Sequence, residues 1–184
     1  MENTIEYRKA SNNLTRMHEI GHAVVALLLG ATEVGIATKT QGGLYSTLPT
    51  TEIDASVFQN WSPEERLMFL MAGYAGELLY KEEVLRKTNH PDSQYVSLIF
   101  KKDAHANMAI DFQIAMDNGL IARDDSGDQK MNSAIENALN ALIQNRKLCG
   151  RLLMNLQKRS CGLAVDEISA AISEIGLSAY VGVL

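Results

Sequence analysis

The sequence is poor in residues that cross-link or interrupt a chain, with two cysteines and three prolines among 184 residues. Cys149 and Cys161 lack the CxxC spacing of the usual zinc fingers and redox pairs, which argues against both classes. So few cysteines suit a reducing compartment, and we interpret both as structural residues. With no internal repeat and no low-complexity linker, residues 1–184 are predicted to form a single domain.

Two further absences bear on where the protein acts and on what it binds. The longest apolar run, residues 23–29, is far shorter than the ~20 residues that cross a membrane. The polar N-terminus also lacks the apolar core of a signal peptide. We therefore expect a cytoplasmic protein with no membrane span in this chain. There is no block of Lys and Arg, and the net charge of −5 argues against nucleic acid as a partner.

Apolar spacing and helix-capping residues predict a mainly α-helical fold with one small β element. Helices are expected over about 14–29, 63–79, 95–116 and 132–157, and a shorter helix begins near Val165. Ser62 and Pro63 are a typical helix start. Residues 33–50, EVGIATKTQGGLYSTLPT, predict a β-hairpin around Gly42 and Gly43. Residues 123–130, RDDSGDQK, are expected to form a polar loop.

The stretch His18-Glu19-Ile20-Gly21-His22, in the first expected helix, is an HExxH motif. Residues four apart on a helix share one face, so both imidazoles can converge on one tetrahedral Zn²⁺ ion. Glu19 would then act as the general base toward a zinc-bound water. The alternative interpretation is that both histidines are merely hydrogen-bonded residues at the start of a buried helix.

A catalytic zinc usually has three protein ligands and one open position, so a third ligand is needed. The candidates are Glu77, His90, Asp103 and His105. His90 lies in a loop that contains a proline and is expected at the surface, while Asp103 and His105 point in different directions on a helix. Glu77 lies among small residues, where an unpartnered carboxylate is costly, so it is a ligand or orients one. The residues alone leave Glu77 and Asp103 both open.

Beyond the motif, several segments in order resemble the peptidase domain of the FtsH-type ATP-dependent zinc metalloproteases. HEIGHAVVALLLG is similar to that family's HEAGHA zinc helix, EVGIATKTQGGLYSTLP to the hairpin after it, and AGYAGELLY to its GGRxAEEL-type helix. The resemblance covers roughly residues 8–119 and implies a helical domain with a small sheet next to the zinc helix. Tyr74 stands where arginine is usual, and Leu78 where a second glutamate would be.

The resemblance also implies that an aspartate on a downstream helix is the third zinc ligand. Asp103, within KKDAHANMAI, is the position that corresponds best. Its surroundings differ from the family's, because VSLIFKK replaces a Gly-Ala-containing turn and Asn107 and Asp111 replace small residues. With Asp103 as the ligand, Glu77 would orient a ligand or serve as the fallback.

In this family the glycine-containing second strand of the hairpin lies beside the active site. Gly42, Gly43 and Leu44 are therefore candidates to hold a substrate as an added strand, although the two glycines also suit a simple turn. The resemblance implies a zinc-dependent endopeptidase that hydrolyses peptides or unfolded proteins. The alternative is a non-catalytic peptidase-like module that binds a protein partner or assembles an oligomer.

Family members carry an ATPase module, whereas this sequence has no GxxxxGK[ST] phosphate-binding loop. Because the sequence also begins with Met1, we expect a stand-alone peptidase-like protein. Such a protein would act on peptides or already unfolded chains, or it would depend on a separate ATPase. Further copies of the same chain, in a homo-oligomer, are another candidate partner.

Overall fold

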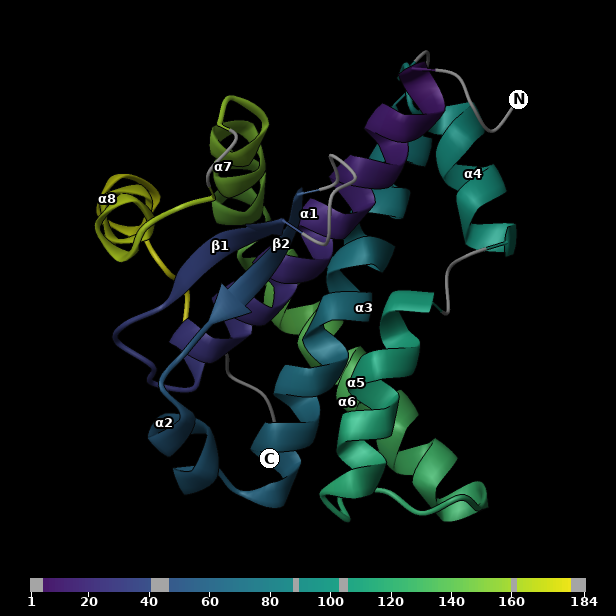
Figure 1. The fold of residues 1–184 in the computed structure, drawn as a ribbon, viewed down its shortest axis with the longest axis vertical. Coiled ribbons are helices and arrows are strands. Elements are labelled where there is room, and N and C mark those ends of the chain that lie inside the picture. The colour runs from purple at the N-terminus through teal and green to yellow at the C-terminus, as the bar shows by residue number, and fades with distance from the viewer. Residues whose placement is uncertain (1–4, 41–46, 88–89, 103–105, 160–161, 180–184) are drawn as a thin grey trace.

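Two long helices, α1 (Ile5–Leu28) and α3 (Pro63–Arg86), form the centre of this computed structural model and pack against each other (Figure 1). The structure describes residues 5–40, 47–87, 90–102, 106–159 and 162–179. Glycines let the two helices approach closely. A Cβ atom on Gly21 would collide with the carbonyl oxygen of Ala72, and one on Gly76 with that of Met17. Small residues at these positions therefore set the spacing of the central pair.

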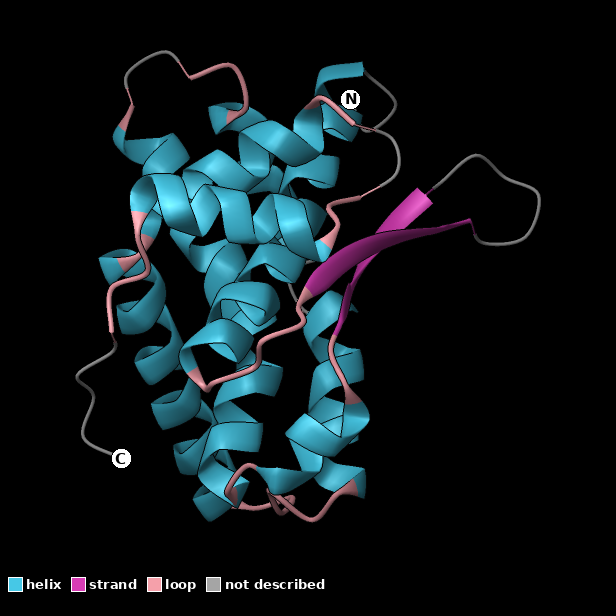
Figure 2. Ribbon diagram, turned by 90° about the vertical axis from the view of Figure 1, so that its left-hand side faces the viewer, coloured by secondary structure: helices cyan, strands magenta, loops and turns pink. Residues whose placement is uncertain are grey.

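The other elements surround the central pair. They are β1 (Gly35–Thr40), β2 (Thr47–Glu52), α2 (Ala55–Asn60), α4 (Ser93–Lys102), α5 (Ala106–Asp117), α6 (Asp125–Gln144), α7 (Arg146–Gln157) and α8 (Val165–Ile175). Helices α5 and α6 pack on α3, while α4 and α7 pack on α1. The two strands lie along one side of the helices (Figure 2). The described part of the chain is thus mainly helical with one small antiparallel sheet, which confirms the coarse prediction.

The hairpin predicted over residues 33–50 is confirmed as an antiparallel pair, with Gly35 opposite Glu52 and Ile36 opposite Thr51. Ile36 also exchanges two backbone hydrogen bonds with Leu163, which ties the sheet to the segment before α8. Strand β2 contacts α1, so the sheet lies against the helix that carries the HExxH motif.

Several predicted helix boundaries are wrong. The segment predicted as a polar loop, residues 123–130, mostly belongs to α6, because the Asp124 side chain accepts a hydrogen bond from Gly127 N (2.9 Å) and so caps that helix. The helix expected over 132–157 is two helices that meet at Asn145, whose Nδ2 donates to the carbonyls of Ala141 (2.9 Å) and Ser178 (3.1 Å). The first helix begins earlier than predicted, at Ile5.

The other helix predictions agree better with the structure. The capping box at Ser62 and Glu65 starts α3 at Pro63, as predicted, although α3 continues past residue 79. The helix expected over 95–116 corresponds to α4 and α5, and residues 103–105 lie outside the described residues. Helix α8 begins at Val165, as predicted.

The apolar core lies between α1, α3, α6 and α7, and residues 20 and 23–26 of α1 lie within it. A smaller apolar cluster joins α3 to α5 and α6, with Leu67, Met71 and Ala115 among its members. Because these two apolar clusters pack tightly around α1 and α3, both helices are held rigid at the motif histidines and at the residues that face them. Of the described helices, none is both long and apolar enough to cross a membrane.

Candidate metal centre

The two histidines of the HExxH motif lie on α1 and face the same point. His18 and His22 are both buried, and their Nε2 atoms are 3.1 Å apart. One helical turn separates them, as the i, i+4 spacing predicts. The burial of this face of α1 against α3 explains why the imidazoles turn inward rather than toward solvent.

The other ring nitrogen of each histidine has a partner on α3. His18 Nδ1 lies 2.9 Å from Glu77 Oε1, and His22 Nδ1 lies 2.8 Å from the carbonyl oxygen of Phe69. Both partners accept hydrogen bonds, so each histidine donates its Nδ1–H. In a neutral imidazole the remaining nitrogen, Nε2, then carries a lone pair. Histidine ligands of metals are oriented in this way by partners at the second nitrogen.

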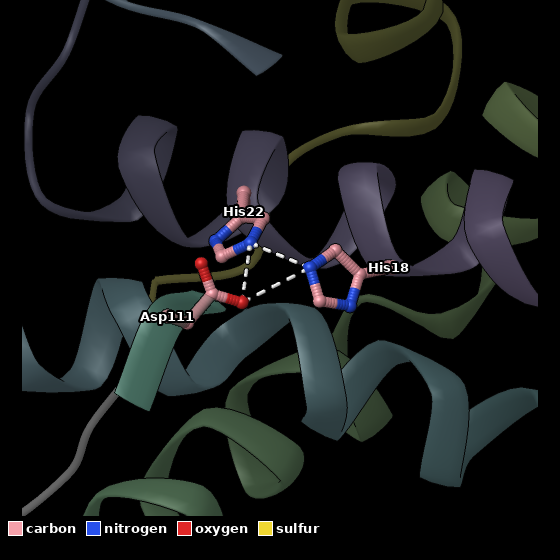
Figure 3. A group of neighbouring side chains, drawn as sticks. All are labelled: His18, His22 and Asp111. Carbon is pink, nitrogen blue, oxygen red and sulfur yellow. Dashed lines mark hydrogen bonds and ion pairs between the residues drawn. The ribbon is translucent and has the colours of Figure 1, made fainter. Parts of the chain in front are cut away.

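A carboxylate from a third helix completes the group. Asp111, on α5, places Oδ2 at 3.1 Å from His18 Nε2 and 3.6 Å from His22 Nε2 (Figure 3). These are ion-pair distances, but the geometry is not that of a hydrogen bond, and Oδ2 is buried without a hydrogen-bond partner. Two lone-pair nitrogens and one carboxylate oxygen therefore converge, all within 4.8 Å of one another.

The separations fit the donor atoms of one small cation. For metal–ligand bonds of about 2.0–2.1 Å, two ligands of a tetrahedral zinc ion lie about 3.3 Å apart. The observed separations of 3.1, 3.1 and 3.6 Å lie around that value. Among the described residues, His18, His22 and Asp111 form the group of His, Cys, Asp or Glu side chains that can hold a metal ion.

Without a metal, a proton must separate these acceptors. Burial by itself would lower the pKa of His18, but the carboxylates of Asp111 and Glu77 outweigh it and raise this pKa to about 10. Burial by itself would raise the pKa of Asp111, but the two histidines lower it to about 2. The metal-free site thus favours a cationic His18 and an anionic Asp111.

Space for the two imidazoles comes from Gly73 on α3. A Cβ atom built there would lie 2.6 Å from His22 Nε2 and would also collide with the His18 ring. Any larger residue at position 73 would therefore displace the two nitrogens that face Asp111. The Phe69 ring also lies against His22, with ring centroids 5.0 Å apart.

Glu19 lies outside the converging group. Its Oε2 accepts a hydrogen bond from the backbone N–H of Thr51 on β2 (2.6 Å) and lies 2.7 Å from Thr51 Oγ1. That hydroxyl also lies 2.8 Å from the backbone oxygen of Glu19 and donates to one of the two at a time. The contact fixes the sheet to α1, and the role of Glu19 as a general base stays a prediction.

The remaining candidate residues have different outcomes. Glu77 is buried and contacts His18, in the position of a group that orients a ligand. His90 is half-buried and accepts a hydrogen bond from Asp92 N (3.1 Å), away from the converging group. Asp103 and His105 lie outside the described residues, as do Gly42, Gly43 and Leu44, so their roles stay predictions.

Asp111 is the residue of this group that sequence reasoning did not select. A signal for it was present, because Asp103, Asn107 and Asp111 are spaced by four and would share one face of a continuous helix. The resemblance pointed to Asp103, since small residues are usual at the two later positions. Thr51 had no sequence signal.

No protein-family model matches this chain, and no curated protein matches it. The relation to the FtsH-type peptidases therefore stays a prediction. The His18, His22 and Asp111 group does not depend on that relation, since it follows from the geometry.

Proposed function

We propose that the protein is a zinc-dependent endopeptidase whose metal is held by His18, His22 and Asp111. One observation carries the proposal: three buried acceptor atoms converge at the separations of metal ligands. The other ring nitrogen of each histidine, Nδ1, is hydrogen-bonded to Glu77 or to the Phe69 carbonyl. Three protein ligands leave one position of a tetrahedral ion open, the arrangement of catalytic zinc.

The surrounding residues have distinct tasks in this proposal. Glu77 and the Phe69 carbonyl hold the imidazoles in the metal-binding tautomer. The bound metal would supply an activated water and a Lewis acid for the peptide carbonyl. Glu19, next to His18, would take a proton at Oε2, which requires that its carboxylate leave Thr51. An already unfolded chain is the proposed substrate, and a separate ATPase would be needed for folded ones.

The contact of Glu19 with Thr51 favours a second candidate, a non-catalytic module in which the metal stabilises the fold. In such a module the glutamate joins the sheet to α1 through the hydrogen bond from Thr51 N, and no reaction requires its release. The two candidates share the metal and differ in what Glu19 does.

Metal content separates the alternatives for the third ligand. We expect about one zinc ion per chain in the wild type by elemental analysis of anaerobically purified protein. Asp111→Asn should lose the metal, while Asp117→Asn, an exposed aspartate on the same helix, should keep it as a matched control. Loss on Asp103→Asn but not on Asp111→Asn would overturn our ligand assignment. Two histidines and a carboxylate also suit iron(II), so stoichiometric iron would overturn the choice of zinc.

Cleavage of a labelled unfolded protein tests the reaction. Glu19→Gln should keep the zinc and lower the rate by about 10²- to 10⁴-fold, the usual contribution of a general base. Adding a chelator should abolish cleavage in the wild type. A zinc-loaded protein that cleaves no unfolded substrate would instead support the non-catalytic module.

A further inference from the structure

A cavity lies away from the metal centre, between α1, the C-terminal part of α3 and α7. Its volume is about 870 Å³, within the range of small-molecule sites. Lys9 and Met17 of α1, Val84 of α3 and Leu153 of α7 are among the residues that line it, and His18, His22 and Asp111 are not. A ligand here would therefore have its own contacts, independent of the metal.

Positive side chains gather around this cavity, although the chain as a whole carries a net charge of −5. The cationic lining residues are Lys9, Lys87, Arg146, Lys147 and Arg151. Arg151 pairs with Glu174, while the other four form no ion pair among the described residues. Four cations around one cavity, none with an ion-pair partner in the part of the chain that the structure describes, create a positive potential that attracts anions.

Two acidic residues, Glu83 and Asp92, also line the cavity and offset only part of this charge. Asp92 is 3% exposed, and its Oδ2 accepts hydrogen bonds from Tyr80 OH (2.6 Å) and Asn13 Nδ2 (3.0 Å). Its carboxylate is thus satisfied inside the protein and joins the loop before α4 to α1 and α3. Asp92 keeps its negative charge, so Asp92 and Glu83 set two negative charges against the four cations that form no ion pair among the described residues, and the balance at the cavity stays positive.

The wall of the cavity is apolar, and a glycine keeps it open. The apolar lining residues include Met17, Leu79, Val84, Leu153, Met154 and Ile175. Gly150, in the middle of α7, also lines the cavity, and a Cβ atom at this position would have no atom within 4 Å. Glycine inside a helix costs about 1 kcal/mol relative to alanine, and no close packing at position 150 requires it. A large side chain at this position would occupy the cavity.

We propose that this cavity binds a small organic anion with an apolar body, such as a carboxylate on a hydrocarbon chain. The lysine and arginine side chains around the cavity would hold the acidic group, and the apolar wall would bury the hydrocarbon. Both features are needed, because an inorganic anion would make no contact with the apolar wall and a neutral hydrocarbon would form no ion pair with the cations. The site is independent of the zinc proposal, so either can fail alone.

Calorimetric titration with decanoate tests the chemistry of the proposed ligand. We expect saturable binding with a stoichiometry near one, and at least tenfold weaker binding of decanol, decyltrimethylammonium and inorganic phosphate. The titrations are repeated with excess chelator, which should leave decanoate binding unchanged. No saturable binding of decanoate, or equal binding of decanol, would overturn the proposal.

Two pairs of variants test the location. Gly150→Phe should abolish decanoate binding by filling the cavity, whereas Gly150→Ala should keep it and raise the melting temperature. Lys147→Glu should weaken binding at least tenfold, whereas Arg123→Glu, an exposed residue outside the cavity with the same charge change, should not. Circular dichroism confirms that each variant is folded. Unchanged binding in folded Gly150→Phe, or equal losses in Lys147→Glu and Arg123→Glu, would refute this location.

Discussion

Replacing Gly73 by alanine puts a methyl group where the two imidazoles meet. The added carbon would lie 2.6 Å from His22 Nε2 and would also overlap the ring of His18. Since ordinary contacts between side-chain atoms are about 3.5–4.0 Å, both rings must move away from the new methyl group by about 1 Å. Metal sites tolerate deviations of only about 0.2 Å in ligand distance, so zinc binding should be lost or greatly weakened.

The rings cannot move freely, because each is held at Nδ1 by a group on the same helix as Gly73. Moving His18 stretches its 2.9 Å contact with Glu77, and moving His22 stretches its 2.8 Å contact with the Phe69 carbonyl. Overpacking of this kind costs about 1–3 kcal/mol, even without metal. For a chain of this size that lowers the melting temperature by roughly 2–12 °C.

Two measurements check this prediction: zinc affinity by competition with a chromophoric chelator, and thermal unfolding with and without EDTA. Gly150→Ala is the matched control, because it is the same substitution inside a helix with open space around it. The control should bind zinc as the wild type does and melt at a slightly higher temperature. Wild-type zinc affinity and melting temperature in Gly73→Ala would refute the assigned position of the two Nε2 atoms.

Four further predictions concern ligand orientation, protonation and thiol reactivity. Glu77→Gln should weaken zinc binding about 10- to 100-fold in the same competition assay, because it removes the charge that orients His18. In EDTA-treated protein, folding raises the pKa of His18 from an ordinary 6.5 to about 10. Protonation of His18 therefore stabilises the folded state completely below pH 6.5, and this stabilisation is lost as the pH rises through 10. Thermal unfolding should show this loss, and His18→Ala should not. Calorimetry in buffers of different ionisation enthalpy should accordingly find about one proton released on zinc binding at pH 8. Burial raises the pKa of Cys149 to about 12, so thiol reagents at pH 8 should label it in Cys161→Ser protein only after unfolding.

The sequence by itself determined the elements that depend on local chemistry. Ser62, Pro63 and Glu65 specify the start of α3 through a capping box, which is a contact within one helical turn. The spacing of His18 and His22 placed both imidazoles on one face of α1 for the same reason. Apolar periodicity predicted one helix where the structure has two, α6 and α7. The helices separate at Asn145, whose side chain hydrogen-bonds to backbone carbonyls, and apolar periodicity does not detect such a contact.

Only the tertiary structure decided what faces the two histidines. Asp111 lies 89 positions beyond His22, and it reaches the site because α5 packs on α3 and α3 packs on α1. Such packing depends on many contacts between distant segments, so helical spacing could not choose among the acidic residues of residues 103–111. The contact between Glu19 and Thr51 likewise follows from the sheet lying on α1. Local spacing presents the ligands on a helix face, and long-range packing selects their partners.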